Sequence, residues 1–149
     1  MRVGSGLLWA VLIGCGCGGD GGLGTQGFEL RFDAAALPGD TERLVVYVLP
    51  SLITTVEGEE EISCDMFVGP TADREIVEYT GYVINRPIQK TVDDPEEDTA
   101  VRIEDLPEGR LVFVVQAYDQ SSALLALGCG KGQIERGKKT FIAIYMDPR

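Results

Sequence analysis

Alternation of apolar and polar residues at every second position is the feature that most limits how this chain can fold. In FELRFD, residues 28–33, three apolar side chains alternate with three charged ones. Successive side chains of a β-strand point to opposite faces, so this pattern predicts a strand with one buried face. Five further segments have the apolar, β-branched composition of strands: RLVVYVLP (43–50), TAVRIEDL (99–106), RLVFVVQAYD (110–119), ALLALGC (123–129) and KTFIAIYM (139–146).

Short polar turns separate these segments, and no long amphipathic helix is evident between them. This arrangement predicts an all-β fold, an antiparallel sandwich of two sheets. Residues 51–98 have a less regular pattern. We predict a strand over residues 74–84, although Ile76, Tyr79 and Val83 also fall at helical spacing, and one turn of helix within residues 63–69.

One segment carries a family resemblance. IEDLPEGRLVFVVQAYD, residues 103–119, resembles a recurring stretch of immunoglobulin-like and transthyretin-like sandwich modules. In those modules a strand ends in Leu-Pro-x-Gly, and the next strand runs outward to Ala-x-Asp before a tight turn. Leu111 stands where such modules commonly have a tyrosine after the first turn. The resemblance implies a fold and carries no function, because such modules bind many different ligands or none.

The composition argues against several classes of function. The chain has 24 acidic and 13 basic residues, a formal net charge of −11, and no histidine. The acidic excess disfavours nucleic acid as a partner, and it disfavours adhesion to anionic lipid through basic patches. Without histidine, Ser-His-Asp and Cys-His catalysis and histidine-based zinc sites are impossible. We therefore expect a protein that is not an enzyme and has no metal or other cofactor.

The first residues have the pattern of a membrane-export segment. Arg2 is followed by a mostly apolar run through Ile13, which is too short to span a bilayer stably. Leu12-Ile13-Gly14-Cys15 then resembles the bacterial lipobox. In bacterial lipoproteins the cysteine of this motif receives a diacylglycerol thioether, and the signal peptide is cut in front of it. The resemblance therefore implies lipidation of Cys15, whereas Cys17 fits less well because Gly14 would occupy the aliphatic position.

The glycines after this motif admit a second interpretation, a dinucleotide-binding turn, which we reject because the glycine-rich continuation cannot form the required helix. The sequence thus predicts three parts: a signal peptide (1–14), a lipidated cysteine with a glycine-rich tether (15–27), and a β-sandwich domain (28–149). The absence of Asp after Cys15 favours the outer over the inner membrane, by resemblance to sorted lipoproteins.

Two of the four cysteines lie inside the predicted domain, Cys64 and Cys129. Export would place them in an oxidising compartment, so we predict a structural disulfide bond between them. A redox role is disfavoured, because it usually requires the close C-x-x-C spacing. The fate of Cys17 stays open, either as a free thiol or in a bridge between chains.

The remaining polar motifs have ordinary structural interpretations. Two acidic clusters, EGEEE (57–61) and DDPEED (93–98), match no calcium-loop pattern, and we interpret them as solvated loops. GCGKGQ (128–133) lacks P-loop spacing and predicts an edge bulge or loop beside the disulfide. ERGKK (135–139) predicts a polar turn before the last strand.

These patterns lead to a functional expectation. We expect a lipid-anchored protein of the bacterial cell envelope whose β-sandwich is a structural or protein-interaction module. Its partners would be the membrane, through the lipid, and an envelope protein whose identity the sequence does not supply. The alternative is a carbohydrate- or calcium-binding module, which an exposed row of tyrosines beside a carboxylate-lined concavity would favour.

Overall fold

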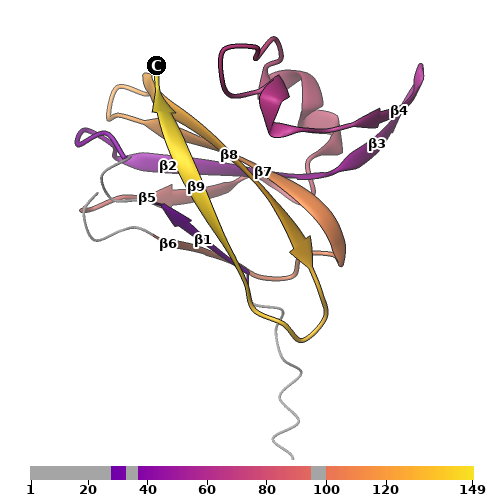
Figure 1. Ribbon diagram of the computed structural model, residues 1–149. Helices are drawn as coiled ribbons and strands as arrows, with labels where there is room; N and C mark the ends of the chain where they lie inside the picture. Colours follow the sequence, from indigo (N-terminus) through magenta and orange to yellow (C-terminus); the bar gives the residue numbers. More distant parts are fainter. Residues whose placement is uncertain (1–27, 33–36, 95–99) are drawn as a thin grey trace, which may run out of the picture.

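The computed structural model describes residues 28–32, 37–94 and 100–149. Cys15, Cys17 and the predicted tether lie outside the described residues. The described chain is mostly β-structure with two short 3-10 helices (Figure 1). Its elements are β1 (Phe28–Phe32), β2 (Arg43–Pro50), β3 (Leu52–Thr55), β4 (Gly58–Glu61), η2 (Cys64–Met66), η3 (Ile76–Tyr82), β5 (Ile88–Thr91), β6 (Ala100–Ile103), β7 (Gly109–Tyr118), β8 (Leu124–Ile134) and β9 (Thr140–Pro148).

Seven strands form one main sheet in the order β5-β2-β7-β8-β9-β1-β6, and β3 and β4 form a separate hairpin. Strand β9 joins the two halves of the main sheet by changing partner along its length. Residues 140–144 pair in parallel with β1, and residues 145–148 pair antiparallel with β8. The predicted all-β class is confirmed, but the main strands form a single continuous sheet, and the β1–β9 pair departs from the expected antiparallel pattern.

The main sheet curls until its two edge strands, β5 and β6, approach each other. Lys90 on β5 bridges them, because its Nζ donates a hydrogen bond of 2.8 Å to the carbonyl oxygen of Ala100 on β6. The enclosed space is filled by buried side chains such as Leu30, Val46 and Phe113. This inner core accounts for the alternation seen in the sequence, since the inward positions of each strand are the apolar ones.

Two glycines let β9 pack closely against β8. A Cβ atom on Gly128 would lie 2.5 Å from Met146 Sδ, 2.6 Å from Ile144 Cγ2 and 2.8 Å from the carbonyl oxygen of Tyr145. A Cβ atom on Gly130 would lie 2.8 Å from Ile142 Cγ2. The prediction of an edge bulge or loop at residues 128–133 is therefore wrong. These residues lie within β8, and the glycines provide room for the large inward side chains of β9.

A second core lies on the outer face of β2, β7 and β8, beneath the segment 51–84. Strand β7 is buried on both faces: Phe113 and Val115 point into the inner core, and Val112 and Val114 point into the outer one. We call residues 51–84, with the β3–β4 hairpin, η2 and η3, the cap. In Figure 1 the cap occupies the upper right of the molecule.

All six strands predicted from the sequence are confirmed, and so is the helical turn within 63–69. The strand predicted over 74–84 is wrong, because this segment contains η3. Ile76 and Tyr79 are both buried and stand three residues apart, which places them on one side of a 3-10 helix. The helix begins where the amide of Glu75 donates to Glu78 Oε1 at 2.9 Å.

Candidate functional site

A groove of about 470 Å³ lies between η3, the residues that precede it, and the outer face of β7 and β8. Buried Val114, Leu127 and Ile76 are among its lining residues. Val77 and Leu124 also line it and are exposed apolar side chains. The groove therefore offers an apolar lining to a ligand, with two apolar contacts accessible from solvent. We call it the cap groove.

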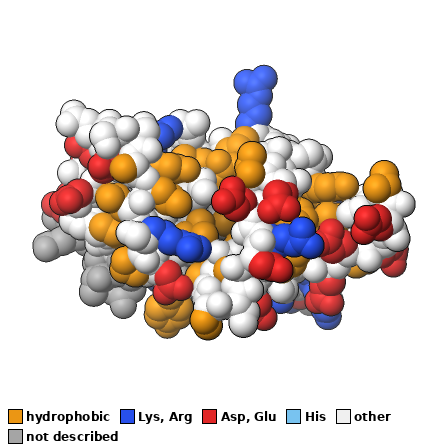
Figure 2. All heavy atoms as spheres, turned by 90° about the horizontal axis from the view of Figure 1, so that it is seen from above, with side chains coloured by type: hydrophobic (Ala, Val, Ile, Leu, Met, Phe, Trp, Pro, Cys, Tyr) orange, Lys and Arg blue, Asp and Glu red, His pale blue; other side chains and the backbone are white. Residues whose placement is uncertain are grey.

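Two arginines line the cap groove. Arg149 is held at both its backbone and its side chain, because its amide donates to the Leu125 carbonyl at 2.9 Å and its Nη2 to the Phe67 carbonyl at 3.2 Å. Arg74 reaches Glu78 at 3.4 Å and Asp73 at 4.0 Å. Seen from above, basic and acidic side chains lie among apolar ones on this side of the molecule (Figure 2). The lining thus combines apolar contact with fixed charges of both signs.

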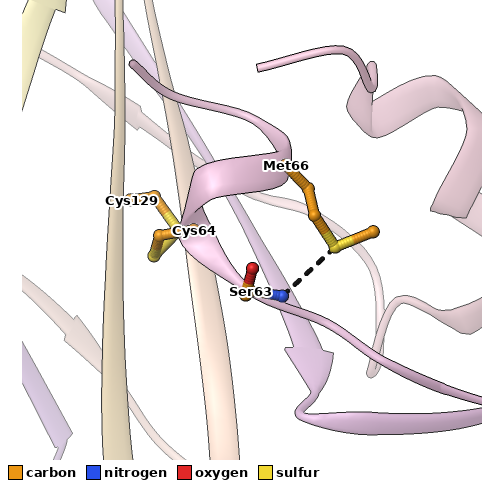
Figure 3. The surroundings of a disulfide bond; sticks show 4 residues. All are labelled: Ser63, Cys64, Met66 and Cys129. Carbon is orange, nitrogen blue, oxygen red and sulfur yellow. Dashed lines mark hydrogen bonds between the residues drawn. A yellow bond between two sulfur atoms is a disulfide. The ribbon is translucent and has the colours of Figure 1, made fainter. Parts of the chain in front are cut away.

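A disulfide bond fastens the cap to the main sheet. Cys64 in η2 is bonded to Cys129 in β8, with their Cα atoms 5.5 Å apart (Figure 3). The turn that presents Cys64 is held by the amide of Ser63, which donates to Met66 Sδ at 3.3 Å. The predicted Cys64–Cys129 pair is therefore confirmed, and it links a helical turn to the middle of a strand.

Tyr79 joins parts of the cap to one another. Its hydroxyl donates to Glu60 Oε1 at 2.9 Å, and its ring meets Phe67 edge to face with centroids 5.4 Å apart. Burial, aided by the bond to Glu60, raises the pKa of Tyr79 to about 12. The phenol therefore stays protonated at neutral pH and acts as a hydrogen-bond donor that joins η3 to β4.

The first acidic cluster lies in a hairpin and not in the predicted solvated loop, whereas the second is described only in part. Residues 57–61 belong to the β3–β4 hairpin, where Glu60 binds Tyr79. Of the second cluster, Asp93 and Asp94 are described, and residues 96–98 lie outside the described residues. Among the residues that the structure describes, no group of three or more His, Cys, Asp or Glu side chains could hold a metal ion.

The tyrosines do not form the exposed row that sugar binding would favour. All five lie in the described part of the chain: Tyr79 is buried, Tyr47 and Tyr118 are partly buried, and only Tyr82 and Tyr145 are exposed. Tyr118 donates to Gln116 Oε1 at 2.7 Å and stacks against the Arg43 guanidinium. No observation here specifically favours a carbohydrate or calcium site.

The cap groove itself was not predicted from the sequence. It brings together residues 72–77, β7, β8 and the last residue, Arg149, which are far apart in the chain. The one local signal was the helical spacing of Ile76 and Tyr79 in a segment that we interpreted as a strand.

No protein-family model, curated protein or solved structure matches the chain. Over residues 28–32, 37–94 and 100–149, no helix is both long and apolar enough to cross a membrane.

Proposed function

We propose that this chain is a lipid-anchored protein of the bacterial cell envelope, not an enzyme, and that its β-domain is a protein-interaction module. The disulfide bond between Cys64 and Cys129 is the observation that carries the proposal. A bridge between these two cysteines is expected in an exported protein and rare in a cytosolic one. It also leaves Cys15, the cysteine of the lipobox-like motif, available for a diacylglycerol group.

The cap groove supports the interaction role. It is lined by side chains that are already held in place, since Cys64–Cys129 fastens the cap to the main sheet and the Tyr79–Glu60 hydrogen bond joins η3 to β4 within the cap. A preformed apolar surface binds a partner at a smaller cost in ordering entropy. We propose an envelope protein as its partner, with an apolar side chain placed between Val77 and Leu124.

The anchor is tested by fractionation and labelling. We expect wild-type protein to incorporate radiolabelled palmitate and to sediment with membranes, with the outer membrane favoured because Gly16 follows Cys15. The variant Cys15→Ser should lose the label and accumulate as precursor or soluble protein. The matched control Cys17→Ser should behave like wild type. Membrane sedimentation and labelling of Cys15→Ser equal to wild type would refute lipidation at this residue.

The partner site is tested by crosslinking in the native envelope. A photoreactive amino acid in place of Leu124 should capture a protein that mass spectrometry identifies. The variant Val77→Asp should weaken this capture about tenfold or more, because it places a charge in an apolar contact. A photoreactive residue in place of Val56, exposed at the tip of the β3–β4 hairpin, is the control position. Equal capture at both positions would count against the groove.

We also propose that the fold is an immunoglobulin-like or transthyretin-like variant. Residues 103–119 support this, because they connect β6, which pairs with β1, to β7, which pairs with β2 and β8. The segment therefore crosses from one side of the inner core to the other, as the corresponding segment of a sandwich does.

A further inference from the structure

The end of the domain nearest the predicted anchor has a distinctive surface. Phe28, the first described residue, pairs with Thr140, so the β8–β9 turn at residues 135–139 lies beside the start of β1. Both lie at the lower end of the molecule in Figure 1, away from the β3–β4 hairpin. If Cys15 is lipidated, only residues 16–27 separate it from the start of β1, so this end stays close to the lipid surface.

Several basic residues lie at or near this end, among them Arg31, Arg102, Arg136, Lys138 and Lys139. Four of them form ion pairs: Arg31 and Arg102 with Glu29, Arg136 with Glu108, and Lys138 with Glu135. In every pair the cation lies further out. The cation side chains are 61% to 86% exposed, and their carboxylate partners are 19% to 52% exposed.

The ion pairs of Arg74 on the cap do not share this order. Arg74 is 46% exposed, against 45% for Glu78 and 78% for Asp73. Glu104 and Asp105 add carboxylates to the lower end. At the lower end, therefore, the cations are available for contact because they are the outermost charged groups, and not because of an excess of positive charge.

Two exposed aromatic side chains accompany these cations on the outer side of β9. Phe141 is 53% exposed and Tyr145 is 73% exposed. The guanidinium of Arg31 lies 4.6 Å from the centre of the Phe141 ring. In the register of the sheet, Glu29 is opposite Phe141, which places this ring one residue from the start of β1. We call Arg31, Arg102, residues 135–139, Phe141 and Tyr145 the basic-aromatic face.

The net charge of −11 disfavours adhesion of the whole chain to anionic lipid, but the basic-aromatic face presents its cations outermost. We propose that this face rests on the anionic phospholipid headgroups of the membrane that holds the anchor. Aromatic rings and basic side chains are the residues that settle at the membrane–water interface. Each contact is weak for a free domain, but the tether keeps the face at high local concentration beside the lipid. The acidic β3–β4 hairpin lies toward the opposite end, where red side chains gather on the right of Figure 2, so repulsion favours the same orientation.

This proposal rests on the lipid anchor of the proposed function, and its consequence is orientation. With the lower end on the bilayer, the cap groove and the hairpin face away from the lipid and are accessible to a protein partner.

The experiment uses tryptophan fluorescence, because Trp9 is the chain's one tryptophan and lies in the predicted signal peptide. Full-length mature lipoprotein carrying Phe141→Trp, Tyr145→Trp or the control Tyr82→Trp is reconstituted in vesicles of phosphatidylglycerol and phosphatidylcholine with brominated acyl chains. Tyr82 is an exposed residue of η3 in the cap. We expect the Phe141→Trp indole to be quenched about threefold more than the Tyr82→Trp indole, with Tyr145→Trp between them.

The charge contribution is tested in the same vesicles. The triple variant Arg136→Gln/Lys138→Gln/Lys139→Gln, combined with Phe141→Trp, should lose most of the quenching, and the control Arg74→Gln should keep it. Uniform quenching at the three positions, or unchanged quenching in vesicles without phosphatidylglycerol, overturns the proposal and leaves the face to a protein partner. Failure of the protein to sediment with vesicles at all overturns the anchor as well, so the two failures are distinguishable.

Discussion

Single atoms decide how closely β8 and β9 can pack. Gly128 has no Cβ atom, and Met146, Ile144 and the Tyr145 backbone lie close to the position where one would be. A sequence reader sees only a glycine-rich stretch there, for which loops are the common explanation. The distinction requires knowledge of which residues lie across the sheet.

The first prediction concerns this position. Gly128→Ala should lower the free energy of unfolding by about 1–3 kcal/mol, because the new methyl group overlaps β9 and forces the strands apart. Urea unfolding measures the effect. Gly39→Ala is the control, since a Cβ there meets no atom within 4 Å, and it should stay within about 0.5 kcal/mol of wild type. Equal stability of the two variants would contradict the packing explanation.

The second prediction follows from the hydroxyl of Tyr79. Burial and the bond to Glu60 raise its pKa to about 12 from an ordinary 10.0. Between pH 10 and 12 the unfolded chain loses the phenolic proton while the folded chain keeps it, so stability falls through that window. Tyr79→Phe should cost about 1–2 kcal/mol at pH 8, and this difference should shrink as the pH rises toward 12.

Chemical denaturation at pH 8, 10 and 11.5 tests this pH dependence. Tyr82→Phe is the control and should match wild type at pH 8, because Tyr82 is exposed. A Tyr79→Phe deficit that stays constant up to pH 11.5 would show that the phenol does not titrate differently in the folded state.

At the scale of elements, six strands of the main sheet could be predicted from sequence, whereas most of the cap, apart from the turn of η2, could not. Period-two alternation is a local signal, and the inner core enforces it in β6, where Val101 and Ile103 are buried and Arg102 is exposed. The cap has no such pattern, because its hairpin and 3-10 helices are held by distant partners: Cys129 for η2 and the outer face of β7 for Ile76. Its structure therefore depends on contacts that only the folded chain provides.

The third prediction is that the cap depends on its disulfide bond. The bridge closes a loop with a sequence separation of 65 residues. Replacing both cysteines, as Cys64→Ala/Cys129→Ala, should cost about 4 kcal/mol in the chain-entropy estimate. Hydrogen exchange should show lost amide protection first in the cap, residues 51–84, because short 3-10 helices and a two-stranded hairpin are weak alone. Uniform loss across β7 and the cap would indicate that the two form one cooperative unit.

At the scale of the whole molecule, closure of the sheet brings together edges that the sequence leaves unrelated. Lys90 and Ala100 lie on opposite edges, and their hydrogen bond joins β5 to β6. The cap groove is likewise formed by segments that are distant in the sequence, since residues 72–77 and Arg149 both line it. Sequence patterns predicted the strands of this architecture. They did not predict the seam, which is the contact between edge strands β5 and β6, or the cap groove. Each depends on how distant segments of the chain meet.

The fourth prediction tests the seam. Lys90→Met keeps the aliphatic stem but removes the charged donor, and it should lower the free energy of unfolding by about 1–2 kcal/mol. Lys131→Met, at an exposed position of β8, is the matched control and should have little effect. Faster hydrogen exchange in β5 and β6 of the Lys90 variant would identify the seam as the site of opening. Unaltered exchange in both strands would refute a role for Lys90 in closure.

The parallel pairing of β1 with β9 has a consequence for biogenesis. The first and last strands of the domain are neighbours, so a nascent chain cannot complete its sheet until the ribosome has finished the final segment. Such high contact order slows folding to milliseconds or longer. If the protein is exported, as proposed above, this delay favours transit of the chain in an extended state and acquisition of its structure only after delivery.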